Sequence, residues 1–95
     1  MRVLVLPDQL THGTATACCR MLAQALRSDP APQAVADASA LRSFDSSALA
    51  VLLECRREAL ALGKTFSVSQ LPPRLRELAT LYGVSELLPP AALPH

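Results

Sequence analysis

The sequence predicts a small α/β sandwich, in which a central mixed sheet of about four short strands carries its helices largely on one face. Strand-like and helix-like segments alternate along the chain, and this alternation is typical of a sheet with parallel neighbours. The connections between them are short and contain Pro, Gly or other turn residues. A chain of 95 residues, 51% apolar and only 3% aromatic, forms one domain whose core is built from Leu, Val and Ala. We expect that domain over residues 1–89 and a Pro-rich tail over residues 90–95.

The first strand and the first helix are separated by turn residues. The apolar run "RVLVL", residues 2–6, contains two β-branched valines and is followed by proline, so it predicts a buried strand. Residues 7–14 are rich in turn and capping residues, and helical periodicity then covers residues 14–27. The buried face of this helix is predicted to consist of Cys19, Leu22, Ala23 and Leu26. Pro30 cannot continue the helix.

The middle of the chain holds a weak strand and the strongest helix. Residues 33–39 contain alanine, a poor strand former, but their brevity and their position between two helices favour a strand. After a connection over residues 40–45, a helix is predicted over residues 46–62. Its buried stripe is predicted to consist of Ala48, Leu52, Cys55, Ala59 and Leu62. Gly63 is suited to the position that follows a helix C-terminus.

A third strand and helix follow. Residues 64–70 alternate Phe66 and Val68 with polar neighbours, as a half-buried strand does. The pair Pro72-Pro73 is tolerated in a first helical turn and begins the third helix. Its inward stripe is predicted to consist of Leu71, Leu75, Leu78 and Tyr82. Gly83 ends this helix, and one more short apolar element precedes the tail.

Charge and composition exclude several classes of function. The net charge is +1 and the nine basic residues are scattered, so we expect no nucleic-acid-binding surface and assign the pair Arg56-Arg57 to a solvated face. No apolar run reaches the roughly 18 residues of a transmembrane helix, so we expect no direct membrane insertion. The chain has no C-x-x-C motif, and His12 and His95 are isolated, so neither a metal site nor a cofactor is expected.

The odd number of cysteines indicates a reduced, cytoplasmic protein. Cys19 and Cys55 fall on the apolar stripes of their helices, and we expect both to be buried and slow to react with thiol reagents. Cys18 lies one helical step, about 100°, away from its neighbour.

The stretch "SFDSSALAVLL", residues 43–53, places three polar side chains directly before an apolar helix. Asp45 or Ser46 can supply the oxygen that caps the first free N–H groups of that helix. One cap needs only one side chain, so surplus hydroxyls remain in the positive potential of a helix N-terminus, which favours an anion such as a phosphate carried on Ser46. Two interpretations therefore stay open, which are capping alone and a functional surface.

The longer segment "VADASALRSFDSSALAVLLECRREALALGKTFSV" resembles the STAS domain, the family of anti-sigma factor antagonists and related modules. The family pattern is a strand that ends in Asp, then Asp-Ser-Ser/Thr-Gly-Leu opening a helix, then Gly and another strand. The chain matches this pattern at Asp37, Asp45, Ser46, Ser47, Leu49 and Gly63. Ala48 stands where Gly is usual, and Asp8-Gln9-Leu10 lacks the Gly of the family's Gly-Glu-Leu. The resemblance covers residues 2–89 and implies a small STAS-like sandwich.

The resemblance implies one of two functions. In sigma-factor antagonists, the position of Ser46 is the phosphorylation site, and the partner is a kinase that is also an anti-sigma factor. In the MlaB-like branch, the STAS protein is a small cytosolic subunit of the Mla phospholipid-trafficking ABC transporter, and the same position lies at the contact with the ATPase subunit. The resemblance also implies that the partner surface comprises Asp45, Ser46, Ser47, Ala48 and Leu49.

The C-terminal segment favours the transporter branch. The segment "LRELATLYGVSELLP", residues 75–89, is similar to that branch, whose third helix ends in Leu-Tyr before a short Leu-Leu-Pro segment. The pair Ser46-Ser47 is the form of the motif found in sigma-factor antagonists, so the antagonist function stays open as an alternative. The chain has neither G-x-S-x-G nor a P-loop, and we expect no enzyme activity. The sequence therefore predicts a non-catalytic module that binds and stabilises or regulates an ABC-transporter ATPase, in the cytoplasm and at the inner membrane through its partner complex.

Overall fold

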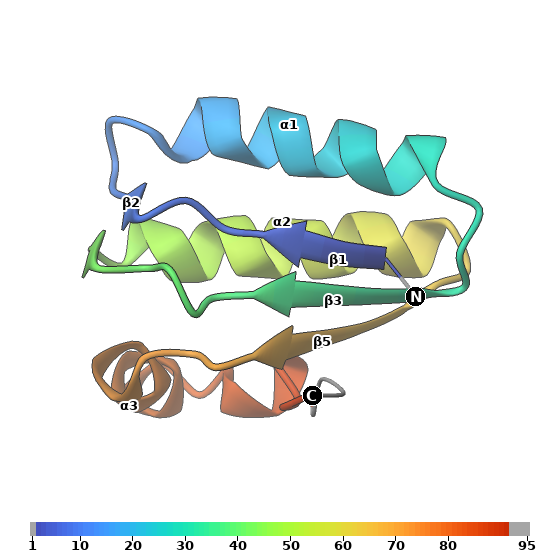
Figure 1. The fold of residues 1–95 in the computed structure, drawn as a ribbon. Coiled ribbons are helices and arrows are strands. Elements are labelled where there is room, and N and C mark those ends of the chain that lie inside the picture. The colour runs from blue at the N-terminus through green and yellow to red at the C-terminus, as the bar shows by residue number, and fades with distance from the viewer. Residues whose placement is uncertain (1, 92–95) are drawn as a thin grey trace.

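The computed structural model describes residues 2–91 and has the expected α/β fold. The elements, in chain order, are β1 (Arg2–Val5), β2 (Gln9–Leu10), α1 (Ala15–Ser28), β3 (Gln33–Asp37), β4 (Ser43–Phe44), α2 (Ser47–Ala61), β5 (Thr65–Ser69), α3 (Pro73–Leu81) and the 3-10 helix η1 (Ser85–Leu87). Figure 1 shows α1 and α2 side by side along the sheet, with α3 beyond β5. No helix within residues 2–91 is long and apolar enough to cross a bilayer.

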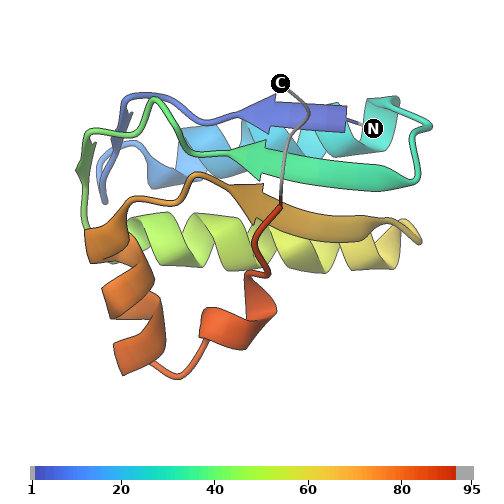
Figure 2. The same cartoon turned by 60° about the horizontal axis from the view of Figure 1, so that its bottom comes forward.

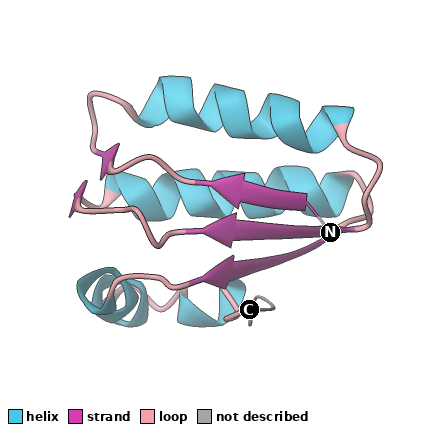
Figure 3. Cartoon of the chain, in the orientation of Figure 1, coloured by secondary structure: helices cyan, strands magenta, loops and turns pink. Residues whose placement is uncertain are grey.

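The main sheet has three strands in the order β1-β3-β5, and a separate short pair joins β2 to β4. Every strand pair within residues 2–91 is parallel, whereas the sequence had predicted a mixed sheet. Each strand of the main sheet returns through a helix, and such a crossover brings the next strand back in the same direction. The two crossovers, β1 to β3 through α1 and β3 to β5 through α2, step across the sheet in the same direction. Because such parallel crossovers are right-handed, α1 and α2 cover the same face of the sheet (Figure 3).

The chain after η1 covers the outer edge of β5. The Val68 N–H donates to the Pro89 carbonyl over 2.8 Å, and the Ala91 N–H donates to the Val68 carbonyl over 2.9 Å. The Arg76 guanidinium holds the same segment through a 2.9 Å hydrogen bond to the Leu88 carbonyl. Figure 2 shows this segment rising from η1 toward β5. The first two residues of the expected tail therefore pair with the sheet, while residues 92–95 lie outside the part that the structure describes.

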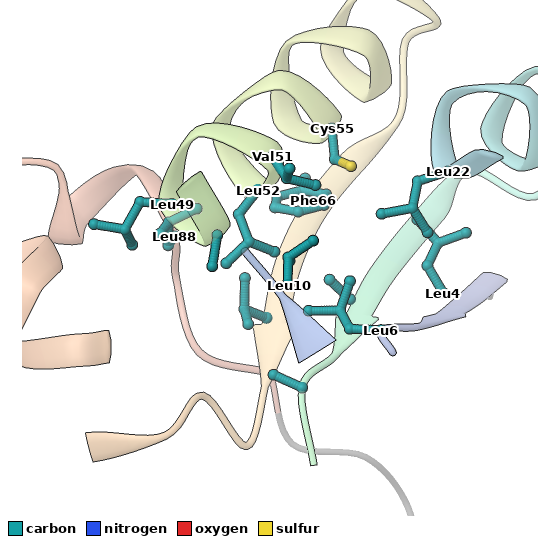
Figure 4. Close-up of a cluster of buried hydrophobic side chains, with 14 of the residues drawn as sticks. Leu4, Leu6, Leu10, Leu22, Leu49, Val51, Leu52, Cys55, Phe66 and Leu88 are labelled. Carbon is teal, nitrogen blue, oxygen red and sulfur yellow. The ribbon is translucent and has the colours of Figure 1, made fainter. Parts of the chain in front are cut away.

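The core lies between the sheet and the helices α1 and α2, includes side chains of α3 and of the segment after η1, and consists largely of leucine side chains. Its most completely buried large side chains are Leu6, Leu10, Leu26, Leu52, Leu75, Leu88, Val68 and Cys55. Figure 4 shows side chains of β1, α2 and β5 meeting in this layer, with Phe66 beneath α2. The aliphatic core agrees with the composition of the chain.

The buried face of α1 differs from the prediction by one position. Cys18, Leu22 and Leu26 are buried, at spacings of four residues, whereas Cys19 is only half-buried. Ala23 is half-buried as well. The periodicity located the apolar side of this helix, but Cys19 turns toward α2 and leaves the sheet-facing position to Cys18.

Two predicted core residues are exposed because they lie beyond the ends of their helices. Leu62 follows α2 and is 42% exposed, and Tyr82 follows α3 and is 55% exposed. Gly63 and Gly83, which come next, have φ of +75° and +72° and turn the chain away from each helix axis. Ala79 takes the buried position next to Leu75 on α3.

Candidate functional site

The N-terminus of α2 meets the loop between β2 and α1 at the carboxyl end of the sheet. Asp45 joins the two, because its Oδ1 accepts a 2.8 Å hydrogen bond from the Ser47 N–H and its Oδ2 accepts a 3.0 Å bond from the His12 N–H. The Thr14 hydroxyl closes the same loop on itself through bonds with the N–H and carbonyl of Thr11. The carboxylate of Asp45 therefore positions both backbones.

These contacts lower the pKa of Asp45. The largest cause is the hydrogen bond from the His12 N–H, followed by the bond from the Ser47 N–H. Both donors favour the ionised carboxylate, and the neighbouring His12 side chain adds a smaller favourable effect. The charge of Asp45 thus maintains the loop against the helix at neutral pH.

Ser46 occupies the N-cap position, but its hydroxyl is not the cap. The residue has helical backbone angles, φ −63° and ψ −16°, and within residues 2–91 its side chain makes no capping hydrogen bond. Asp45, one position earlier, satisfies the Ser47 N–H instead. The Ser46 side chain is exposed, so its hydroxyl is available to a partner or to a modifying enzyme.

The five residues of the expected partner surface divide into two groups. Asp45 and Ser46 are exposed and Ser47 is half-buried, so these three lie at the surface. Ala48 is 0% exposed and Leu49 is 3% exposed, and both side chains belong to the core. The structure thus brings together three of the five residues as an accessible group.

Two grooves flank this group of residues. A groove of about 290 Å³ lies between β4 and α3 and is lined by Phe44, Arg74, Glu77, Leu78 and Leu81. A second groove of about 250 Å³ lies between α1 and α2 and is lined by Ala15, Thr16, Cys19, Ala50, Val51 and Glu54. Phe44 precedes Ser46 by two residues and Ala50 follows it by four, so the Ser46 end of α2 lies between the grooves.

The sequence did not indicate the residues of these grooves or the role of His12. The contact of His12 uses its backbone N–H, which carries no signal of residue type. Leu81 is an apolar residue of the third helix that does not belong to the predicted inward stripe, and it is 76% exposed. An apolar side chain outside that stripe was the available signal for a surface groove. No cluster of His, Cys, Asp or Glu within residues 2–91 could hold a metal ion.

Comparisons with known proteins agree with the fold. The family model described as "Mlab, STAS domain" matches residues 2–89. No curated protein sequence matches the chain significantly.

Solved structures share the fold at low sequence identity. A STAS domain protein from Planctomyces limnophilus has a TM-score of 0.79 at 14% identity, over 97% of this chain and 82% of that chain. The anti-sigma factor antagonist SpoIIAA in its unphosphorylated form has a TM-score of 0.74 at 19% identity, over 95% of this chain and 78% of that chain. The Bacillus cell fate determinant SpoIIAA in its phosphorylated form has a TM-score of 0.66 at 20% identity, over 95% and 81% of the two chains. At these identities the likeness is one of fold.

Proposed function

This chain belongs to the MlaB-type STAS domain family, and on that premise we propose that it is a non-catalytic module that binds the ATPase subunit of a phospholipid-transporting ABC system. The partner contact is made by Asp45, Ser46 and Ser47 at the N-terminus of α2. Binding stabilises or positions the ATPase and so supports outer-membrane lipid asymmetry. The protein works in the cytoplasm and reaches the inner membrane through that complex.

The observation that carries the proposal is that Asp45, and not Ser46, caps α2. Asp45 accepts the hydrogen bond that caps α2 from the Ser47 N–H and a second bond from the His12 N–H, so stability does not require the exposed hydroxyl of Ser46. A polar side chain with no structural contact at a helix N-terminus is well suited to a partner interface. Together with Ser46, the two grooves on either side form a surface that combines apolar and polar side chains, as protein interfaces do.

The same region supports binding rather than chemistry. A serine nucleophile needs a base within hydrogen-bond reach, and within residues 2–91 no side chain accepts a hydrogen bond from Ser46. The nearby His12 contributes its backbone N–H to Asp45. The arrangement therefore positions a surface and does not activate the hydroxyl.

A second candidate function is an anti-sigma factor antagonist that is switched by phosphorylation of Ser46. The accessible hydroxyl favours it, because a phosphate could be added there without breaking a capping bond. The phosphate would add about −1.5 to −2 charges next to Asp45 and change which partner fits. A structural neighbour is known in both phosphorylated and unphosphorylated forms.

Pull-down with two purified partners tests both candidates. The bait is the full chain, and the two preys are the ATPase subunit of the Mla-type transporter and an anti-sigma factor kinase from the same organism. We expect capture of the ATPase by the wild type and loss of capture with Ser46→Asp, at an unchanged melting temperature. Ser85→Asp, which changes a half-buried serine on η1, is the matched control and should retain capture. Capture of the kinase alone would favour the second candidate, and equal capture of the ATPase by Ser46→Asp would exclude this interface.

A further inference from the structure

The groove of about 290 Å³ between β4 and α3 lies directly beside Ser46. Phe44, the last residue of β4, lines this groove, and only Asp45 separates it from Ser46. Figure 2 shows α3 at the end of the molecule where α2 begins. We propose that this groove receives an amphipathic helix of the ATPase subunit, packed along α3. This inference rests on the proposed function and adds the kind of partner segment that the site recognises.

A partner bound at Ser46 needs more surface than its immediate neighbours provide. A stable interface buries about 800 Å² on each partner, from roughly 20–30 residues. The accessible group consists of Asp45, Ser46 and Ser47, and Ser47 is already half-buried. The contact therefore has to extend onto a surface next to this group, and the centre of such a contact is apolar.

The groove along α3 offers a partner more apolar surface to bury than the groove between α1 and α2 does. Leu81 lines it and is 76% exposed. The lining of the other groove is largely made of small side chains, those of Ala15, Thr16, Cys19 and Ala50. Its largest apolar side chain, Val51, is already buried within the chain. Burial of Leu81 therefore favours the groove along α3 as the extension of the contact.

The apolar surface of α3 continues from the core into this groove. Leu75 and Ala79 are the buried residues of the helix. At about 100° per residue, Leu78 lies about 60° around the helix from Leu75, and Leu81 lies about 60° further in the same direction. Leu78 packs against the core, whereas Leu81 stands clear of it. The exposed leucine is thus the outer end of a continuous apolar strip, and such a strip is typical of an interaction surface.

Two exposed side chains of opposite charge border the strip. Arg74 and Glu77 line the groove, and within residues 2–91 they make no ion pair and no side-chain hydrogen bond. Arg76 on the same helix, by contrast, donates to the Leu88 carbonyl. Arg74, Glu77 and Leu81 follow one another at intervals of about one helical turn. A helix that lies along α3 presents its own side chains at the same intervals, so the fitting segment carries an acidic, a basic and an apolar residue in this order along the groove.

Calorimetric titration of the full chain with the purified ATPase subunit of the Mla-type transporter from the same organism tests the groove. We expect Leu81→Gln to raise the dissociation constant at least about tenfold, because the complex loses a buried leucine side chain. The matched control is Met21→Gln, which makes a comparable change at a side chain that is 65% exposed on α1. This variant should bind like the wild type. Both variants should keep the wild-type Tm, because both side chains are exposed in the free chain.

The same titration tests the charges at the border of the groove. Arg74→Gln and Glu77→Gln should each raise the dissociation constant about two- to fivefold at low salt, and these differences should shrink at high salt, because exposed ion pairs are weak and screened. Arg20→Gln, which removes an exposed charge from α1, should leave the affinity unchanged. If neither Arg74→Gln nor Glu77→Gln changed the affinity, the proposed charge pattern of the partner helix would be wrong.

A photoreactive side chain identifies the segment that occupies the groove. Leu81→p-benzoylphenylalanine, irradiated in the complex, should cross-link to a helix of the ATPase that carries the acidic, basic and apolar residues at intervals of one turn. Mass spectrometry of the cross-linked peptide locates that helix. Cross-linking to a strand or a loop of the ATPase would overturn the proposed occupant.

The outcomes distinguish this inference from the proposed function. If Ser46→Asp abolishes binding of the ATPase and Leu81→Gln leaves it unchanged, the groove inference is wrong and the proposed function stands. If the wild-type chain does not bind the ATPase, both are wrong. Sedimentation of the chain alone covers the remaining occupant, because a dimer that Leu81→Gln dissociates would place a second copy in the groove and overturn the inference.

Discussion

Replacement of Ser46 by alanine separates capping from function at the N-terminus of α2. If the Ser46 hydroxyl were the cap, its loss would cost about 0.5–2 kcal/mol of unfolding free energy. The structure assigns that bond to Asp45, and within residues 2–91 the Ser46 side chain makes no capping hydrogen bond. Ser46→Ala therefore removes an exposed hydroxyl and no contact. Such a surface change is worth no more than about 0.5 kcal/mol in either direction.

The expected change is measurable by thermal unfolding. A domain of this size shifts its Tm by about 4–8 °C for each 1 kcal/mol, so Ser46→Ala should move the Tm by no more than about 2–4 °C. Calorimetry or far-UV circular dichroism at neutral pH resolves that range. Titration with the partner ATPase on the same samples should show weaker binding, because the hydroxyl lies at the proposed contact.

The matched comparison is Asp45→Ala, which removes the acceptor for two backbone N–H groups, one on the His12 loop and one on α2. This variant should lower the Tm clearly more than Ser46→Ala does. If Ser46→Ala destabilised the protein as much as Asp45→Ala, the Ser46 hydroxyl would be a cap after all, and the reasoning above would fail.

Acidification should weaken the contact between Asp45 and the His12 loop, because hydrogen bonds lower the pKa of this carboxyl below its ordinary value of 3.8. The stabilisation is fully present above that value and is lost as the pH falls through the lowered pKa, which NMR titration of the side chain and of the His12 amide would follow. Burial raises the pKa of the Cys55 thiol to about 12, so a thiol reagent at neutral pH should modify the half-buried Cys19 first and Cys55 only on unfolding, as mass spectrometry would report. Lys64 is 7% exposed and its ammonium donates to two backbone carbonyls over 2.6 Å each, so Lys64→Met should lower the unfolding free energy in urea by about 1–3 kcal/mol.

Each of these predictions has a control. An Asp45 carboxyl that titrates at its ordinary value would contradict the hydrogen-bonded contact. In denaturant all cysteines should react at similar rates, and a Cys55 that reacts as fast as Cys19 in the native protein would contradict its burial. Arg57→Met is the counterpart of Lys64→Met, because the Arg57 side chain is 80% exposed and approaches Glu54 only at 3.6 Å. It should leave the urea midpoint nearly unchanged.

The order of strands and helices followed from the sequence because each signal is local. Phe66 and Val68 are buried while Thr65 is exposed and Ser67 is half-buried, as expected for a strand, and Gly63 and Gly83 end their helices with positive φ, as their positions suggested. The family followed from the motif around Asp45, and the match over residues 2–89 confirms it. These features depend on neighbours within a few residues of each other, which a linear sequence displays.

The details of the buried faces and of the site depended on the tertiary structure. A helical stripe is wider than one side chain, so only the packing of α1 against both α2 and the sheet decided that Cys18 is buried and Cys19 is half-buried. The contact between Asp45 and His12 joins residues 33 positions apart, and it releases Ser46 from capping. Leu49 matched the motif yet belongs to the core, because the helix turns it inward. The sequence by itself thus determined the fold class, the family and the place of the candidate site, whereas long-range packing decided which side chains at that place are exposed.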